Sequence, residues 1–415
     1  MSELTYLEKL LDGVKVEWQT LGKVLKRTKG TKITAGQMKA LHKDNAPLKI
    51  FAGGKTVAFV DFKDIPEKDI NREPSIIVKS RGIIEFEYYD KPFSHKNEMW
   101  SYHSNNDAIS IKYIYYFLKI NEGYFQKIGG KMQMPQIATP DTDKFEVPIP
   151  CPDNPEKSLA IQSEIVRILD TFTALTAELT AELNMRKKQY NYYRDQLLSF
   201  DEEQEKPIYL EKLLDGVKVE WKTLEKVLKR TKGTKITAGQ MKALHKDNAP
   251  LKIFAGGKTV AFVDFKDIPE KDINREPSII VKSRGIIEFE YYDKPFSHKN
   301  EMWSYHSNND AISIKYIYYF LKINEGYFQK IGGKMQMPQI ATPDTDKFEV
   351  PIPCPDNPEK SLAIQSEIVR ILDKFDTLTN SITEGLPREI ELRQKQYEYY
   401  RDLLFSFPKP ETASN

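Results

Sequence analysis

Four short, turn-rich stretches of the sequence concentrate the side chains that hold phosphates and read base edges in nucleic acids. They are Lys26–Lys32, Lys79–Arg81, Ser94–Asn97 and Lys131–Gln136. Lysine and arginine neutralise phosphates and pair with guanine, whereas asparagine and glutamine pair with adenine. One such stretch is more often an ordinary solvated loop, but all four occur again later in the chain. Their joint occurrence predicts a nucleic-acid-binding surface.

Residue patterns typical of catalysis or of metal binding are weak or missing. Gly53–Thr56 resembles the end of a phosphate-binding loop, but Lys49 stands where that loop requires glycine, so we expect a turn. The sequence has no Gly-x-Ser-x-Gly and no Cys-x-x-Cys motif. The six histidines are not at metal-ligand spacing, and Cys151 and Cys354 lie in identical contexts that indicate a repeated structural position. We therefore expect a binding protein that has no catalytic site, disulfide framework or metal site.

The composition is typical of a folded globular protein of two or three domains, with 415 residues, 40% hydrophobic and 29% charged. A net charge of +2 does not by itself indicate a nucleic-acid partner, so the predicted basic surface must be local. The sequence has neither an apolar run of about 18 residues nor a signal-peptide core at its start. We therefore expect a cytoplasmic protein without a membrane partner.

Two copies of one module, offset by 203 residues, make up almost the whole sequence. Lys23–Asp170 and Lys226–Asp373 are identical over 148 residues. The copies then diverge and agree again at Lys188–Tyr190 and Lys395–Tyr397, where Tyr190 lies 20 residues after Asp170 and Tyr397 lies 24 residues after Asp373. The second copy is therefore four residues longer in this region.

Each copy divides into a compact α/β part and a long helix. The runs Ser75–Lys79 and Gly82–Tyr89 predict strands, and Ile109–Leu118 predicts a helix. Asn154 followed by Pro155 predicts the start of a second helix. Isoleucine and leucine at three- and four-residue steps then continue a helical pattern for about 45 residues.

A long helix with one apolar stripe needs a partner along its length, and the corresponding helix of the other copy is the obvious one. Gly385 and Pro387 should break or kink that second helix. The two modules close most simply with these helices antiparallel and the modules at opposite ends. The predicted fold class is α/β, with two globular domains separated by two long antiparallel coiled-coil helices in a pseudo-twofold arrangement.

Over essentially its whole length, the sequence resembles the specificity subunit of a Type I restriction-modification enzyme. The resemblance is carried by Pro148–Pro152, Gln162–Asp170, Lys188–Tyr190 and Tyr193–Asp195, together with their second copies. The run Thr176–Leu183 resembles the tandem Thr-Ala-Glu-Leu spacer unit of one subgroup. The resemblance implies two target-recognition domains, each reading half of a bipartite site on double-stranded DNA. Because recognition domains vary among relatives, the resemblance fixes no base-contacting residue, but the stretches Lys79–Gly82 and Gly129–Gln136 resemble family positions that face DNA.

The resemblance also implies the partners of the chain. Its helices would dock two methyltransferase subunits, to which restriction-translocation subunits add. S-adenosylmethionine, ATP and Mg would bind those partners, and no cofactor would bind this chain. Family members usually carry two different recognition domains, whereas the two here are identical, which predicts an interrupted palindromic DNA site.

The expected boundaries and site residues follow from these patterns. Target-recognition domains are expected at 1–152 and 209–355, spacer helices at 153–200 and 356–407, a linker at 201–208 and a C-terminal tail at 408–415. The expected DNA-binding residues are Lys29, Lys32, Lys79, Arg81, His95, Lys96, Asn97, Lys131, Gln133 and Gln136, and their copies Lys232, Lys235, Lys282, Arg284, His298, Lys299, Asn300, Lys334, Gln336 and Gln339. The expected residues for helix packing or partner binding are Tyr190, Tyr193, Arg194, Tyr397, Tyr400 and Arg401.

Two other classes of function stay open at this point. A self-contained nuclease or methyltransferase lacks a recognisable motif, and activity of the purified chain alone would support it. A helical scaffold whose modules bind proteins would differ from a DNA-binding subunit in its response to salt. DNA binding through several phosphates loses affinity steeply as salt rises, whereas an apolar protein interface does not.

Overall fold

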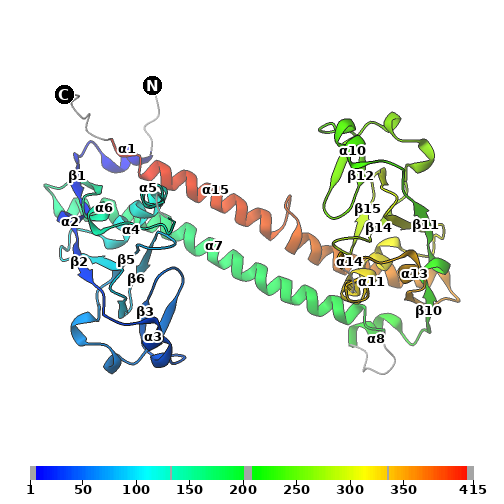
Figure 1. Cartoon of the computed structure of the whole chain (residues 1–415), viewed down its shortest axis with the longest axis horizontal. Coiled ribbons are helices and arrows are strands. Elements are labelled where there is room, and N and C mark those ends of the chain that lie inside the picture. The colour runs from blue at the N-terminus through cyan, green and yellow to red at the C-terminus, as the bar shows by residue number, and fades with distance from the viewer. Residues whose placement is uncertain (1–5, 131–132, 201–207, 334–335, 409–415) are drawn as a thin grey trace. The chain divides into compact units, whose positions relative to one another are not determined.

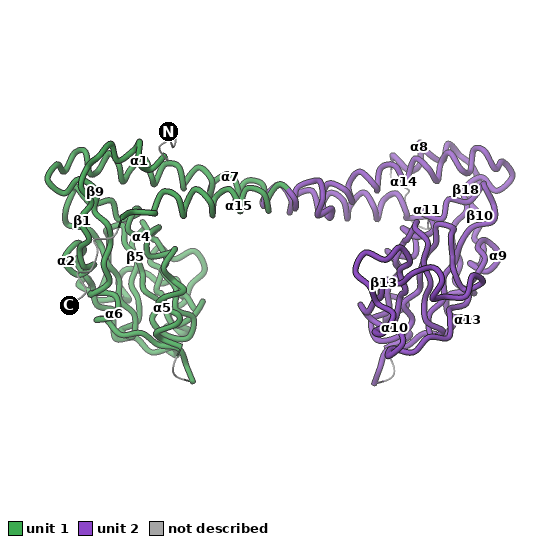
Figure 2. Tube along the Cα trace, turned by 90° about the horizontal axis from the view of Figure 1, so that it is seen from above, with its two compact units in different colours: residues 1–179, 389–415 green, residues 180–388 purple. Residues whose placement is uncertain are grey.

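The computed structural model describes residues 6–130, 133–200, 208–333 and 336–408. The chain divides into two compact units, each described here by itself (Figure 2). Unit 1 comprises residues 1–179 and 389–415, and unit 2 comprises residues 180–388. Because helix α7 (Pro155–Leu197) spans the division, its first part belongs to unit 1 and its last part to unit 2.

The α/β module of unit 1 is built from short strands and helices, whose chain order Figure 1 shows by colour. Its strands are β1 (Val16–Thr20), β2 (Lys26–Lys29), β3 (Leu48–Phe51), β4 (Val57–Val60), β5 (Ser75–Lys79), β6 (Glu85–Tyr89), β7 (Phe93–His95), β8 (Trp100–His103) and β9 (Glu146–Pro150). Its helices are α1 (Tyr6–Leu11), α2 (Leu21–Val24), α3 (Ala35–Leu41), α4 (Ile111–Ile120), α5 (Glu122–Gly129) and α6 (Thr139–Asp143), with the 3-10 turns η1 (Phe62–Asp64) and η2 (Glu67–Asp69).

The module of unit 2 repeats these elements. Its strands are β10 (Val219–Thr223), β11 (Lys229–Lys232), β12 (Leu251–Phe254), β13 (Val260–Val263), β14 (Ser278–Lys282), β15 (Glu288–Tyr292), β16 (Phe296–His298), β17 (Trp303–His306) and β18 (Glu349–Pro353). Its helices are α8 (Ile208–Leu214), α9 (Leu224–Val227), α10 (Ala238–Leu244), α11 (Ile314–Ile323), α12 (Glu325–Gly332) and α13 (Thr342–Asp346), with η3 (Phe265–Asp267) and η4 (Glu270–Asp272).

Strand β5 lies at the centre of the module, inside a four-stranded sheet of order β2-β8-β5-β6. Alternate residues of a strand point to opposite faces, and both faces of β5 are covered. Ile76 and Val78 pack in the large core that contains α4, whereas Ile77 packs with Phe51 and Phe93 of the three-stranded sheet β4-β3-β7. Burial on both faces explains why Ile76, Ile77 and Val78 are apolar at consecutive positions of β5.

The two predicted strands and the first predicted helix are confirmed, with shifted bounds for the second strand and the helix. The Ser75–Lys79 strand is confirmed at both ends, but the second strand begins at Glu85, because Ser80–Gly82 turns away to pair with another loop. The predicted helix Ile109–Leu118 lies at Ile111–Ile120, since the side chain of Ser110 accepts from Tyr113 N and caps it.

Within each unit, the two long helical segments run antiparallel. In unit 1, Ile161 near the start of α7 shares a core with Leu404 at the end of α15 (Leu386–Leu404), and Phe172 stacks on Tyr400 with ring centroids 5.4 Å apart. Positions that advance along α7 therefore retreat along α15. The same holds in unit 2, where α14 (Pro358–Asn380) places Phe375 against Tyr193 at 5.6 Å.

The end of each copy's long helix completes the core of the other copy's module. Unit 1 buries Leu404, Phe405 and Phe407 in the core of the first module. Unit 2 buries Leu197, Leu198 and Phe200 in the core of the second module. The expected division into free-standing recognition domains and spacer helices therefore omits a contribution that each domain receives from a distant segment.

A five-residue interruption, Ser381–Gly385, separates α14 from α15. Gly385 has a φ of +84°, and a Cβ there would lie 2.4 Å from Thr377 O, so only glycine fits this turn. Helices α14 and α15 contain 23 and 19 residues, or 42 together, against 43 in α7. The predicted break is confirmed, and the four extra residues of the second copy are accommodated outside the helices.

Two sets of polar contacts, one of them buried, hold each module to its long helix. The side chain of Gln162, which is fully buried, accepts from Ser110 N and donates to Ala108 O, both at 2.9 Å. Asp170 accepts from Tyr116 Oη and from Lys112 Nζ. Gln365 and Asp373 make the same contacts in unit 2. No helix among the described residues is long and apolar enough to span a membrane.

Candidate nucleic-acid interface

The structure brings the first and third of the four polar stretches into contact. In unit 1, Thr31 N donates to His95 O at 2.7 Å, and Thr31 pairs with Lys96 in a parallel bridge. The loop after β2 therefore lies against the loop after β7. In unit 2, Thr234 N donates to His298 O, also at 2.7 Å.

The second and fourth stretches join the same surface. Ser80 Oγ donates to Glu98 O at 2.6 Å, which ties the end of β5 to the loop after β7. Gly82 N then donates to Pro135 O at 2.9 Å, and Ile137 N donates to Ser80 O at 3.0 Å. All four stretches, over their described residues, thus form one continuous loop surface in each module. The sequence alone predicted the four stretches but not their order in space.

A basic cleft opens beside this loop surface in unit 2, with a volume of about 830 Å³. Its cationic and amide side chains are Arg230, Lys232, Lys235, Lys271, Gln240 and Asn300. Two carboxylates, Asp267 and Asp272, also line the cleft, so its lining carries more positive than negative charge.

The lysines of this cleft are the cations best placed to meet a phosphate. Arg230 is engaged with Asp346 at 3.1 Å, whereas within the described part of the chain Lys232, Lys235 and Lys271 make no ion pair. In the first copy the same sequence positions are Arg27, Lys29, Lys32, Lys68, Gln37 and Asn97.

The cleft confirms the spatial grouping of some predicted residues and adds others. It brings together the predicted Lys232, Lys235 and Asn300. Sequence analysis missed Gln240 and Lys271 as members of this group, and it covered Arg230 only as the copy of Arg27 in the stretch Lys26–Lys32. Lys271 lies between Glu270 and Asp272, a pattern that is typical of a solvated charged turn.

The structure does not support Lys79 and Lys282 as DNA-binding residues. Lys79 is only 7% exposed, and its Nζ lies 2.5 Å from Glu85 and 2.8 Å from Glu87 on the neighbouring strand. Lys282 makes the corresponding ion pairs with Glu288 and Glu290. An ammonium that is buried between two carboxylates presents no net positive charge to a phosphate.

Nor does the structure support His95 and His298 as DNA-binding residues. Both rings are fully buried, and His95 Nε2 lies 3.1 Å from Ser101 Oγ. Burial lowers the pKa of each histidine to about 4, so both are neutral at pH 7. They are core residues that position the loop after β7.

The other predicted contacts differ in how available they are. Six of them and their copies are exposed, and their contact with DNA stays a prediction: Lys29, Lys32, Arg81, Asn97, Gln133 and Gln136. Lys96 is engaged with Glu98 at 2.7 Å, and Lys299 with Glu301 at 2.8 Å, so these two lysines contribute little net charge. Lys131 and Lys334 lie outside the described residues.

Helix packing is confirmed for the four predicted tyrosines, while docking of a partner stays a prediction. Tyr190 and Tyr397 pack against the cores of their units, and Tyr193 and Tyr400 stack on phenylalanines. Arg194 and Arg401 each bond the neighbouring aspartate. Sequence analysis missed the more exposed neighbours Tyr192 and Tyr399, which are 61% and 65% exposed.

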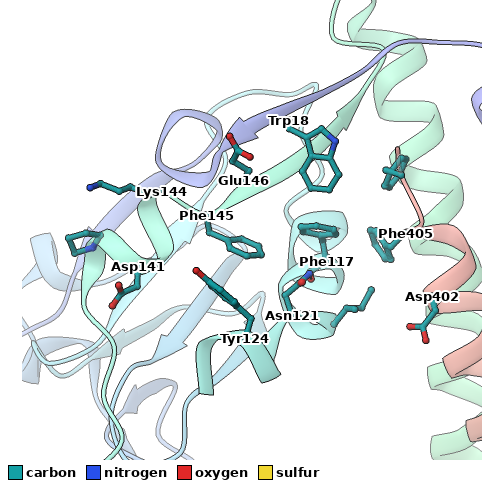
Figure 3. Close-up of a pocket in the computed structure, with 13 residues that line it drawn as sticks. Trp18, Phe117, Asn121, Tyr124, Asp141, Lys144, Phe145, Glu146, Asp402 and Phe405 are labelled. Carbon is teal, nitrogen blue, oxygen red and sulfur yellow. The ribbon is translucent and has the colours of Figure 1, made fainter. Parts of the chain in front are cut away.

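A second cavity of about 830 Å³ lies in unit 1, where the C-terminal segment meets the module. Figure 3 shows Trp18, Phe117 and Phe405 around it, and Asp141, Glu146 and Asp402 on its lining. Its carboxylates outnumber its single lysine, Lys144. This cavity is therefore unsuited to phosphate and is not part of the candidate interface.

Comparison with known proteins agrees with the architecture and the repeat. The family described as "Type I restriction modification DNA specificity domain" matches residues 15–186 and 218–392. The chain is 41% identical over 442 residues to the specificity subunit of the Type I restriction enzyme EcoR124I/EcoR124II of Escherichia coli, with 100% of both proteins covered. It is 34% identical to the EcoprrI specificity subunit of the same organism, with 92% of this chain and 93% of that protein covered.

Among solved structures, the fold is similar to that of a Type I restriction-modification S subunit from M. genitalium. The TM-score is 0.64 at 17% identity, over 96% of this chain and 98% of that one. At this level of identity, the likeness concerns the fold alone.

Proposed function

The chain belongs to the family of Type I restriction-modification DNA specificity subunits, and from this premise we propose that each of its modules reads one half of a bipartite site on double-stranded DNA. The observation that carries the proposal is the continuous loop surface, which is present in both modules beside exposed lysines. Phosphate contacts from lysines supply affinity and register, and neighbouring arginine and amide side chains supply sequence discrimination.

The partners that we propose are two methyltransferase subunits and, through them, restriction-translocation subunits. Exposed tyrosines support docking on the antiparallel helices, because tyrosine is enriched at protein interfaces. They are Tyr192 and Tyr193 in unit 2 and Tyr399 and Tyr400 in unit 1. The complex would methylate adenine in the cytoplasm. S-adenosylmethionine, ATP and Mg would bind to those partners, and this chain would supply sequence recognition.

Methylome sequencing tests the proposed function directly. Cells that express this chain with a compatible methyltransferase subunit should acquire methylation at one bipartite motif, and cells that express the methyltransferase subunit alone should not. Purified complex should bind DNA with an affinity that falls by orders of magnitude between about 50 and 200 mM salt. Motif-independent methylation, or binding that ignores salt, would contradict the proposal and would favour a protein-binding scaffold.

A further inference from the structure

The best candidates for base reading lie on two loop segments that pair through a single bridge and are called the ribbon below. The ribbon consists of Ser80–Ile83 and Gln133–Ile137, and its centre is an antiparallel bridge between Arg81 and Gln136. Gly82, with a φ of +82°, allows the first strand to leave β5 and turn into this pairing. Ser283–Ile286 and Gln336–Ile340 form the same ribbon in unit 2, with a bridge between Arg284 and Gln339.

The hydrogen-bond pattern places the two central side chains next to each other. The bonds from Gly82 N to Pro135 O and from Ile137 N to Ser80 O flank the Arg81–Gln136 pair and do not join it directly. In such a pair the side chains lie on one face of the ribbon, with Cβ atoms about 5 Å apart. This separation lies between one and two times the 3.4 Å rise between base pairs, so both side chains can reach the same or adjacent base pairs.

The chemistry of the pair suits base edges better than phosphates. Arginine pairs with guanine through two parallel hydrogen bonds, and glutamine does the same with adenine. Within the described residues Arg81 makes no ion pair, and its only hydrogen bond runs from Nε to Met134 Sδ at 3.1 Å. The remaining N–H groups of the guanidinium are therefore available.

Two exposed apolar side chains flank the pair. Ile83 is 50% exposed and Met134 is 51% exposed in unit 1, and Ile286 and Met337 are 46% and 52% exposed in unit 2. Large apolar groups are costly in water but make favourable contacts with thymine methyl groups in the major groove. That groove is wide enough to admit a two-stranded ribbon.

The basic cleft has the opposite chemistry, because its lysines carry point charges without a planar fork. The ribbon and the cleft lie next to each other. Ser80 at the start of the ribbon donates a hydrogen bond to Glu98 O, and Met99 follows Glu98 in the chain. The copy of Met99 in unit 2, Met302, lines the cleft. We propose a division of labour, which rests on the proposed function: in each module the ribbon reads base edges through Arg81 and Gln136, or through Arg284 and Gln339, while the lysines of the cleft hold the DNA backbone.

Two double variants, tested in the complex with a methyltransferase subunit, separate these two roles. The double variant Arg81→Lys/Arg284→Lys keeps the charge and loses the bidentate fork, so discrimination at one base pair in each half-site should fall by about tenfold or more. Its salt dependence should stay unchanged. The matched double variant Lys68→Ala/Lys271→Ala should weaken binding to cognate and non-cognate DNA equally and lower the salt slope by about two, one for each module.

The outcomes of this experiment distinguish the division of labour from the proposed function. Unchanged discrimination in the arginine variant, or a changed motif in the lysine variant, would overturn the division of labour. Absence of sequence-specific binding by the unsubstituted complex would overturn the proposed function itself. All four residues are exposed, and unchanged thermal unfolding of both variants would establish that the differences arise at the DNA.

Discussion

At the scale of single residues, position within a strand decides between core and interface. Lys79 and His95 have the side chains of a DNA-binding surface, but both end buried strands of the module. The ion pair between Lys79 and Glu85 could have been predicted from the sequence, because Glu85 and Glu87 occupy alternate positions on the next predicted strand. The burial of His95 was not, since it depends on packing between two sheets that are distant in the sequence.

The two buried histidines predict how stability depends on pH. Each has a pKa of about 4 in the folded state against an ordinary value of 6.5, so the unfolded state binds more protons between these values. Stability is therefore fully present above pH 6.5 and falls as the pH drops towards 4, by about 3 kcal/mol for each histidine.

The double variant His95→Gln/His298→Gln removes both titrating groups, and glutamine can still meet Ser101 and Ser304. We expect urea unfolding of this variant to show a flatter dependence between pH 6.5 and 5, with a residual slope from His103 and His306, because burial also lowers the pKa of these two histidines. A slope equal to that of the unsubstituted chain would show that the two histidines are accessible in the folded protein.

At the scale of elements, the long helix and its Asn-Pro start were predictable because periodicity and capping are local properties. α7 begins at Pro155, with Asn154 accepting from Lys157 N at 3.0 Å. The looped segment Ser381–Gly385 was predictable only as a break. The near-equal helical lengths, 42 residues in α14 and α15 together against 43 in α7, were not predictable from the sequence. They depend on the fact that α7 and the α14–α15 pair both join the same two cores.

Deletions of equal length predict different effects on the DNA spacer. Removing Thr180–Leu183 from α7 takes out about 6 Å of helix, and four residues are close to one turn, so the apolar stripe stays in register. We expect the spacer between half-sites to shrink by one or two base pairs, at 3.4 Å for each. Removing Ser381–Glu384, which lie outside the helices, should leave the spacer unchanged.

Methylome sequencing of the two deletion variants compares them directly. Both should retain the same half-sites, because the modules are untouched. An active Thr180–Leu183 deletion with the original spacer would show that this segment is helix filler. A shorter spacer after removal of Ser381–Glu384 would show that the looped segment contributes to the distance.

At the scale of the whole molecule, the duplication was evident from the sequence, but the exchange of core residues between copies was not. Leu197 and Leu404 lie near helix ends, and no local sequence pattern there indicates which distant residues an apolar side chain contacts. The structure buries them to 2% and 0% exposure in the modules of units 2 and 1.

This exchange predicts which unit each truncation destabilises. Leu404→Ala should cost about 2–5 kcal/mol and lower the unfolding transition of unit 1, whereas Leu197→Ala should act in the same way on unit 2. Leu392 on α15 is 38% exposed and supplies the control, since Leu392→Ala should cost much less. Hydrogen exchange resolved by segment measures the effect, and equal loss of protection in both modules for each variant would contradict it.

The identity of the two modules predicts the symmetry of the DNA site. Every described contact of the loop surface has its copy in the second module, so both modules should read the same half-site. If a twofold axis relates them, as we expect, the half-sites lie on opposite strands and the site is an interrupted palindrome, as for symmetric dimers. Methylation should then appear at the same position in both half-sites. Exchanging residues 15–150 for the module of a relative should convert the palindrome into an asymmetric site with one half unchanged. Two unrelated half-sites in the methylome of the original chain would refute the twofold arrangement.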